Sequence, residues 1–425
     1  MRLAVIRQRY TPYGGAERFV EGALEALLER GVAISLYTRE WPQTRLQLIE
    51  PTIVDPFHVG RLWRDMSFAR EVCRAIGSTK ADLVQSHERV TCCDVFRAGD
   101  GVHAVYLDER LAAAGPLERL ALRASPYHRY VIDAERKLFA SPWLSAVICN
   151  SAMVRDEIRE RYGYPAGKLH VIRNAVDCAA FHPGLRADRE RARAALRIPA
   201  GDTVFLLVGS GYERKGVAAA IRALAMLPGP THLVVVGRES HPQRYARLAR
   251  SLDLSGRVHI AGPQTDPKPY FGAADAFVLP TVYDPCPNAA LEAMACGLPV
   301  ITSTKSGVAE LLTAGDAGLV CPSRDVEALA AHMQALLDPA LRERMGANAR
   351  TAVEPLTPDA MTLQLVLLYR ELLAASVARR RGSSVPVSAP QTAPTSAAST
   401  SPSSAAPDSR PPAPKGEPAP PDAGG

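Results

Sequence analysis

The sequence predicts an α/β protein built from two doubly wound, Rossmann-like domains in tandem. Short aliphatic and β-branched runs alternate with longer helical patterns along most of the 425 residues, which is typical of parallel sheets covered by helices. The alternation breaks once, around residues 171–184, and then begins again. Because a chain of this length exceeds what one hydrophobic core usually organises, the break is expected to be a linker between two domains.

The first alternating series predicts an N-terminal domain over residues 1–173. A strand is expected at 3–6, followed by a helix over 16–30 that ends at Gly31, since glycine commonly terminates helices. The other strands of this domain are expected over 33–38, 83–86, 95–97, 146–149 and 170–172.

The second series predicts a C-terminal domain over residues 174–357. Its strands are expected over 204–209, 233–237, 258–261, 276–280, 300–302 and 318–321. A last helix over 358–378 is expected to pack back toward the N-terminal domain. Residues 382–425 hold almost nothing apolar and are expected to be disordered. Ligands bind such folds beyond the carboxyl ends of the strands, so we expect the domains to face each other across a binding cleft.

Composition excludes several classes of protein and leaves others open. The net charge of +6 permits an acidic partner without selecting one, and 47% hydrophobic residues are ordinary for a globular protein. No apolar run approaches the roughly 20 residues of a spanning helix, and the run at 3–6 is too short for a signal peptide. We therefore expect a cytoplasmic protein. The eight scattered cysteines form no zinc motif, and Cys92 and Cys93 are expected to be two buried thiols.

Three segments have the residue types that bind phosphate or sugar. The first places Gly14 and Gly15 after a strand and before a helix, where free backbone N–H groups suit an anion or an acceptor; a plain turn remains the alternative. The second places Arg214 and Lys215 after the small residues at the end of a strand. Such cations suit a diphosphate leaving group, unless they only solvate a helix end.

The third segment holds two acids eight residues apart. Asp284 lies in a proline-rich loop after a strand, and Glu292 lies in the first turns of the following helix, which Gly297 and Pro299 terminate. Two carboxylates at different depths of one cleft edge suit the hydroxyls of a sugar and of a ribose. An acid near a helix start is also common for dipole reasons alone.

Together these segments resemble family 4 of the retaining GT-B glycosyltransferases, over roughly residues 1–375. Gly14 to Arg18, Arg214 to Gly216 and the run from Asp284 through Val300 carry the resemblance. The loop over 9–15 and the stretch over 87–106 are most similar to the bacterial lipopolysaccharide core heptose-I glucosyltransferase group.

The resemblance implies a role for each matching residue. Asp284 would hold the hydroxyls of the transferred sugar and Glu292 the ribose, although aspartate stands where the family usually has glutamate. Arg214 and Lys215 would neutralise the diphosphate. The complete expected donor-binding set is Gly14, Gly15, Gly209, Arg214, Lys215, Gly237, Arg238, Gly262, Gln264, Asp284, Asn288, Ala289 and Glu292.

Two further residues are expected near the reacting centre. Asp100 and His103 follow the strand at 95–97, where the family places residues that face the anomeric carbon, and with Asp284 they complete the expected catalytic set. An aspartate after a glycine is equally often a turn former, and a loop histidine is often incidental. Of the two, Asp100 is the stronger candidate for a role at the reacting centre.

The expected activity is retaining transfer of a hexose, by default glucose from UDP-glucose, onto a lipopolysaccharide inner-core heptose. No cofactor and no metal are expected: the chain has no DxD motif, and the two cations would stabilise the leaving diphosphate. The alternatives are another family 4 transferase for a different cell-surface glycan and a GT-B sugar-nucleotide epimerase. A non-catalytic nucleotide-sugar-binding scaffold and a nucleic-acid binder are poorly supported.

A contact with an anionic membrane is a softer hypothesis for residues 117–132. This segment combines several leucines with Arg119, Arg123, His128, Arg129, Tyr127 and Tyr130, against Glu118 alone. A basic amphipathic surface of this kind suits an anionic lipid face. An ordinary solvated pair of helices is the alternative.

Overall fold

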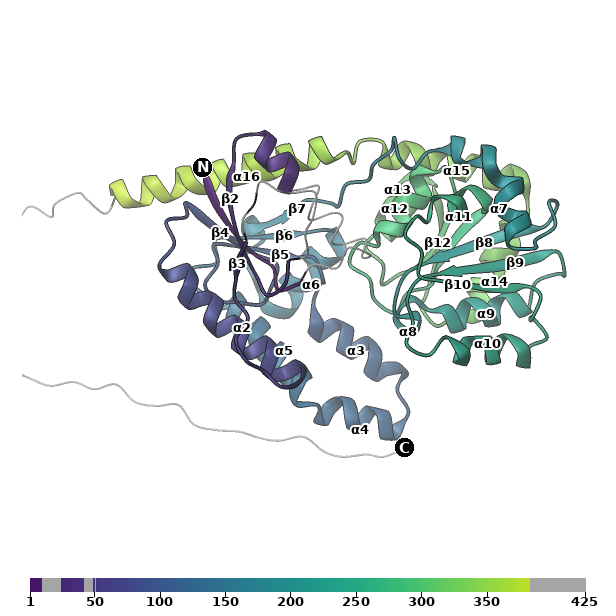
Figure 1. Cartoon of the computed structure of the whole chain (residues 1–425), viewed down its shortest axis with the longest axis horizontal. Helices are drawn as coiled ribbons and strands as arrows, with labels where there is room; N and C mark the ends of the chain where they lie inside the picture. Colours follow the sequence, from purple (N-terminus) through teal and green to yellow (C-terminus); the bar gives the residue numbers. More distant parts are fainter. Residues whose placement is uncertain (10–23, 42–48, 50, 383–425) are drawn as a thin grey trace, which may run out of the picture. The chain divides into compact units, whose positions relative to one another are not determined.

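The computed structural model describes residues 1–9, 24–41, 49 and 51–382. Within them lie a seven-stranded and a six-stranded sheet, each fully parallel. The predicted fold class, two doubly wound α/β units in tandem, is confirmed (Figure 1). The linker is irregular in part, with a 3₁₀ turn at Pro183–Asp188.

The first sheet has the strand order β3-β2-β1-β4-β5-β6-β7. Its central strands are buried on both faces, which explains why they appear in the sequence as short continuous apolar runs. The strands are β1 (Arg2–Ile6), β2 (Ala33–Thr38), β3 (Thr52–Ile53), β4 (Leu83–Ser86), β5 (Val95–Ala98), β6 (Ala146–Cys149) and β7 (Leu169–Val171). Residues 24–29 are helical, and the rest of the helix expected over 16–30, up to residue 23, lies outside the described residues. Further helices of this half are α2 (Gly60–Gly77), α3 (His103–Ala113), α4 (Pro116–Ala124), α5 (Pro126–Phe139) and α6 (Ala152–Tyr162), and a 3₁₀ turn follows at Ala166–Lys168.

The second sheet has the strand order β10-β9-β8-β11-β12-β13. Its strands are β8 (Thr203–Val208), β9 (Thr231–Val236), β10 (Val258–Gly262), β11 (Ala276–Leu279), β12 (Val300–Ser303) and β13 (Gly318–Cys321). The helices are α7 (Arg189–Ala195), α8 (Tyr212–Lys215), α9 (Val217–Ala225), α10 (Pro242–Ser251), α11 (Lys268–Ala273), α12 (Asn288–Ala295), α13 (Ala309–Gly315), α14 (Val326–Ala335) and α15 (Pro339–Val353).

A long last helix, α16 (Pro358–Gly382), lies against the first sheet (Figure 1). Its side chains Leu365 and Tyr369 are buried in one cluster with Leu3 and Val5 of β1. The Tyr369 hydroxyl donates to the side-chain carbonyl of Gln85 on β4. The chain therefore returns from the second sheet to complete the core of the first.

The structure corrects the sequence-based boundaries at a few places. β7 begins one residue earlier than expected, the two-residue strand β3 was not expected, and α16 runs to residue 382. The expected disordered tail lies, beyond residue 382, outside the described residues. The domain limits at 173 and 357 stay a prediction. Within the described segments, no helix has both the length and the apolar character needed to cross a membrane.

One cysteine prediction is wrong. Cys92 is not a buried thiol but is disulfide-bonded to Cys73 of α2, while its neighbour Cys93 is a free, buried thiol as expected. The pairing depends on α2 packing beside the loop that precedes β5, which sequence spacing alone does not reveal.

Candidate active site

The order of the second sheet creates a switch point between β8 and β11. From β8 the chain proceeds outward to β9 and β10, and then returns to place β11 on the other side of β8. Loops that leave the carboxyl ends of two such strands diverge, and ligands of doubly wound folds bind between them. The segment with Arg214 and Lys215 follows β8, and the segment with Asp284 follows β11.

The loop after β8 is shaped so that Lys215 turns back toward the end of the strand. A Cβ atom at Gly209 would lie 2.7 Å from Cε of Lys215, so the lysine stem occupies the space that a side chain would need. Lys215 is buried, with 8% of its surface exposed. Gly209 therefore allows the ammonium group to reach the switch point.

Lys215 and Asp284 form an ion pair there, with 2.5 Å between Nζ and Oδ2. Arg214 Nη1 lies 3.2 Å from the same carboxylate oxygen. The backbone of Asp284 is held as well, because its N–H donates to the carbonyl of Lys305 and its carbonyl accepts from Gly307. Three charged groups that the sequence predicted as one site therefore converge.

Burial and charge act in opposite directions on this pair. Burial alone would raise the pKa of Asp284, but Lys215 and Arg214 outweigh it and hold the pKa below its ordinary value. Burial lowers the pKa of Lys215, and the attraction of Asp284 offsets this only in part. A buried cation of this kind interacts strongly with any anion that reaches it.

The neighbouring strands end in predicted residues that pack against the same loop. The backbone N–H of Gly237 donates to the carbonyl of Gly262, and the N–H of Gly211 donates to the carbonyl of Arg238. The side chain of Gln264 is exposed and donates to the carbonyl of Ala261. Gly237, Arg238 and Gly262 thus lie at the carboxyl edge of β9 and β10, beside Gly209.

Helix α12 holds the remaining predicted donor residues. Asn288 is its first residue, and its Oδ1 accepts from Asn174 Nδ2 at 2.7 Å. Ala289 follows, and Glu292 lies one turn further on, half-buried. The same connection between β11 and β12 therefore carries both acids. Gly14 and Gly15 lie outside the described residues.

The two catalytic candidates of the first half lie in and after the loop that follows β5. Asp100 is exposed, and His103 is the first residue of α3. His103 Nε2 lies 2.9 Å from Nδ1 of His128 on α5. Burial, helped by the charge of Arg89, lowers the pKa of His103 to about 4, so its ring is neutral at physiological pH.

Sequence reasoning missed a residue that joins this loop to Asp284. Tyr283 accepts a hydrogen bond from the backbone N–H of Val102 and donates one to Glu157 on α6. The only signal in the sequence is a tyrosine directly before the first acid of the third segment.

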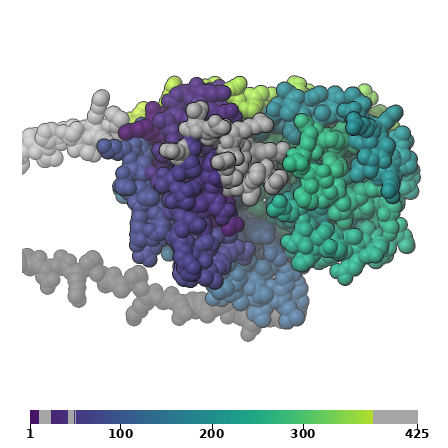
Figure 2. All heavy atoms as spheres, viewed as in Figure 1, coloured from purple at the N-terminus to yellow at the C-terminus, as the bar shows by residue number. Residues whose placement is uncertain are grey.

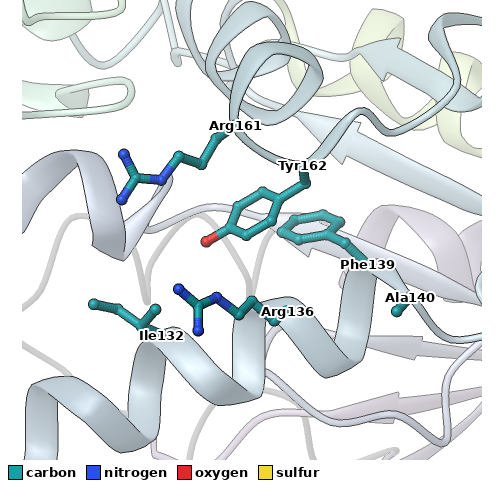
Figure 3. A pocket seen from close by; sticks show the side chains of 6 residues that line it. All are labelled: Ile132, Arg136, Phe139, Ala140, Arg161 and Tyr162. Carbon is teal, nitrogen blue, oxygen red and sulfur yellow. The ribbon is translucent and has the colours of Figure 1, made fainter.

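A separate hollow of about 310 Å³ lies between α5 and α6. Figure 3 shows the side chains of Arg136 and Arg161 on either side of the Tyr162 hydroxyl. None of the predicted site residues lines it. No group of three or more histidine, cysteine or acidic side chains suited to a metal ion occurs among the residues that the structure describes.

Comparison with known families and proteins covers nearly the whole folded region. Residues 13–180 match the family described as Glycosyltransferase Family 4, and residues 188–352 match Glycosyl transferases group 1. Over 370 residues the chain is 35% identical to the lipopolysaccharide core biosynthesis glycosyltransferase LpsE of Rhizobium meliloti, covering 85% of this chain and 96% of LpsE. It is also 35% identical over 222 residues to a glycogen synthase of Mycobacterium tuberculosis, which is 51% of this chain. That match spans only 50% of the synthase's length.

Solved structures show the same architecture. WaaG, a glycosyltransferase involved in lipopolysaccharide biosynthesis, aligns with a TM-score of 0.74 at 24% identity, over 85% of this chain and 98% of WaaG. Anabaena HepE, solved in complex with UDP-glucose, aligns with a TM-score of 0.67 at 19% identity, over 88% of this chain and 100% of HepE. At these identities the likeness shows the fold, which is GT-B.

Proposed function

The chain belongs to the family 4, group 1 glycosyltransferases, and on that premise we propose that it moves a hexose from a nucleotide-diphosphate donor onto a lipopolysaccharide core acceptor. The observation that carries this proposal is the convergence of Arg214, Lys215 and Asp284 at the switch point of the second sheet. Two cations held together at such a point suit a diphosphate, whose negative charge grows as the sugar departs.

UDP-glucose is the donor we propose. HepE, which shares the fold, was solved with this molecule bound. Arg214 and Lys215 would receive the diphosphate, and Glu292 would hold the ribose. Asp284 occupies both cations through one oxygen atom, Oδ2. Donor binding would draw the cations toward the phosphates, leaving Asp284 to accept hydrogen bonds from the sugar's hydroxyls.

The transfer step would break the bond between the anomeric carbon and the phosphate oxygen. An acceptor hydroxyl oxygen would form the new bond on the same face, and the departing phosphate would take the hydroxyl proton. We propose retention of configuration by this route. Lys215, Arg214 and the N-terminus of α12 would stabilise the leaving group without a divalent metal.

The acceptor would meet the donor at the loop after β5. LpsE is named for lipopolysaccharide core biosynthesis, and its similarity to this chain extends over 85% of the sequence. We therefore propose an inner-core heptose as the acceptor, with Asp100 nearest the reacting hydroxyl and His103 behind it.

A peripheral membrane contact would bring the enzyme to this lipid-linked acceptor at the inner face of the cytoplasmic membrane. Leu117 and Leu120 of α4 are 85% and 67% exposed, and Arg119 and Arg123 lie beside them. Figure 2 shows the segment that contains α4 at the surface, in blue at the lower edge. In liposome co-sedimentation, Leu117→Glu together with Leu120→Glu should reduce binding to anionic vesicles. Equal binding of the wild type to anionic and neutral vesicles would contradict the proposed contact with an anionic membrane.

A donor panel tests the proposed function. Purified enzyme is incubated with UDP-, GDP- and ADP-hexoses, with and without a core oligosaccharide truncated before its first hexose. We expect UDP-glucose to be consumed only with acceptor, yielding an α-linked product by NMR. Consumption or isomerisation of the donor at equal rates without acceptor would instead identify an epimerase or a hydrolase.

A further inference from the structure

The hydroxyl of Tyr283, in the loop after β11, is hydrogen-bonded to two residues of the first half of the chain. It accepts a hydrogen bond from the backbone N–H of Val102 at 2.8 Å and donates one to Oε2 of Glu157 at 2.7 Å. Tyr283 itself is 2% exposed. Both hydrogen-bonding capacities of the hydroxyl are therefore used within the protein, 181 and 126 positions away in the sequence.

The loop after β5 has a glycine where Tyr283 contacts it. Gly101 has φ +68°, and a Cβ atom there would lie 2.2 Å from the tyrosine hydroxyl and 2.7 Å from Cγ of Pro285. A side chain at this position would be both strained and in collision with the tyrosine. The two loops thus approach more closely than any residue except glycine permits.

A second set of contacts surrounds the same junction. Lys305, whose carbonyl accepts from the backbone N–H of Asp284, places its ammonium 3.3 Å from Glu109 and 3.6 Å from Glu157. Glu109 lies on α3 and Glu157 on α6, so both acids belong to the first half of the chain. The loop with Asp284 is therefore fixed to the first half on both sides.

We propose that Tyr283 is a positioning residue that holds the loop over 99–102, and with it Asp100, at a fixed place relative to Asp284. Nothing in the hydroxyl's contacts requires it to touch a substrate. Because Tyr283 directly precedes Asp284 in the chain, a donor that binds Asp284 and an acceptor that binds beside Asp100 would be aligned through one rigid connection. Such alignment matters because a small misplacement of reacting atoms is costly in rate.

The kinetic part of this proposal rests on the proposed transferase function, but its structural part does not. Tyr283→Phe removes only the hydroxyl oxygen and leaves the ring packed. Tyr270→Phe on α11, a tyrosine that packs against the core of the second half of the chain, is the matched control.

Amide hydrogen exchange on the full chain measures how well the backbone near Val102 is protected, and it needs no substrate. In Tyr283→Phe, the Val102 amide loses its acceptor, so peptides spanning 99–104 should exchange about tenfold faster, with melting temperature nearly unchanged. Unaltered exchange in these peptides would overturn the proposal, whatever the enzyme's substrates prove to be.

Comparing transfer with donor hydrolysis tests positioning itself. With UDP-glucose, Tyr283→Phe should lower kcat for transfer to the core acceptor about tenfold, while slow hydrolysis of the donor by water and KM for the donor stay at wild-type values. Faster exchange with an undiminished transfer rate would also overturn the proposal. Absence of transfer in the wild type would instead refute the proposed function and leave the exchange result standing.

Discussion

The ammonium group of Lys215 lies 2.5 Å from the carboxylate of Asp284, although 69 positions separate the two residues in the sequence. Both are buried, and each comes from the segment that follows one of two adjacent strands: Lys215 ends the short helix α8 after β8, and Asp284 lies in the loop after β11. The pair therefore marks the point of the second sheet where a ligand is expected. Asp284 also holds two cations, Lys215 and Arg214, at the place where a departing diphosphate would develop negative charge.

Neutralising the acid of this pair should destabilise the protein. In Asp284→Asn, the buried Lys215 loses its counter-charge, and we expect the free energy of unfolding to fall by about 3 kcal/mol. Chemical denaturation followed by circular dichroism measures this. Adding Lys215→Met to the variant removes the unpaired charge and should restore most of the stability without restoring activity. If Asp284→Asn alone were as stable as the wild type, Lys215 and Asp284 would not form a buried ion pair in solution.

A methyl group at Gly209 should displace the lysine while leaving the sheet intact. Because a Cβ atom there would lie 2.7 Å from Cε and 3.0 Å from Cδ of Lys215, Gly209→Ala should move the ammonium and lower kcat/KM at least tenfold. Gly256→Ala is the control, since no atom lies within 4 Å of the added group there. Steady-state kinetics with UDP-glucose compares the two variants, and equal rates would contradict the role assigned to Gly209.

Much of this arrangement could be predicted from the sequence because it depends on local order. Each strand of a doubly wound sheet delivers its loop to the same edge, so residues after β8 and β11 were expected to meet. The spacing of Asp284 and Glu292 could be assigned to one loop and one helix for the same reason. The motif around Arg214 and Lys215 needed no knowledge of distant packing.

Other features depend on contacts that no local pattern encodes. Tyr283 meets Val102 only because the two halves of the chain pack together at this junction, and its sequence neighbourhood gives no sign of that contact. The disulfide between Cys73 and Cys92 likewise depends on where α2 settles against the sheet. The neutral state of His103 arises from its burial beside Arg89, which the loop sequence does not reveal.

The environment of His103 should make stability depend on pH in the acid range. Its pKa falls from the ordinary 6.5 to about 4 on folding, because burial and Arg89 oppose its charge, while Glu135 favours it and His128 and Arg61 again oppose it. The unfolded chain therefore binds a proton between these values that the folded chain does not. The titration of His103 should therefore leave the free energy of unfolding unchanged above pH 6.5. Below that pH it should lower the free energy of unfolding as the pH falls toward 4, by at most about 3 kcal/mol.

A stability–pH series of urea denaturations measures that decline. In His103→Gln the group that titrates is gone, so the slope between pH 6.5 and 4 should be shallower than in the wild type. His128, whose pKa is also lowered by burial, would leave a residual slope. An unchanged slope in the variant would mean that His103 of the folded protein is protonated across this range, as it is in the unfolded chain.

Removing divalent metal should not affect the transfer reaction. The proposed mechanism assigns the stabilisation of the leaving diphosphate to Lys215 and Arg214, so excess EDTA should leave the initial rate of UDP-glucose consumption within experimental scatter. Titration of Mg²⁺ or Mn²⁺ back into treated enzyme is the control for indirect effects. A rate that falls with EDTA and returns with either ion would assign the charge stabilisation to a metal.

Calorimetric titration of UDP-glucose tests the central claim, that the buried cation at the switch point of the second sheet binds the donor diphosphate. The account predicts that Lys215→Ala weakens donor binding at least tenfold, while Lys268→Ala, which removes a lysine on α11 whose nearest acid is Asp266, binds as the wild type does. Equal dissociation constants for the wild type and Lys215→Ala would contradict it.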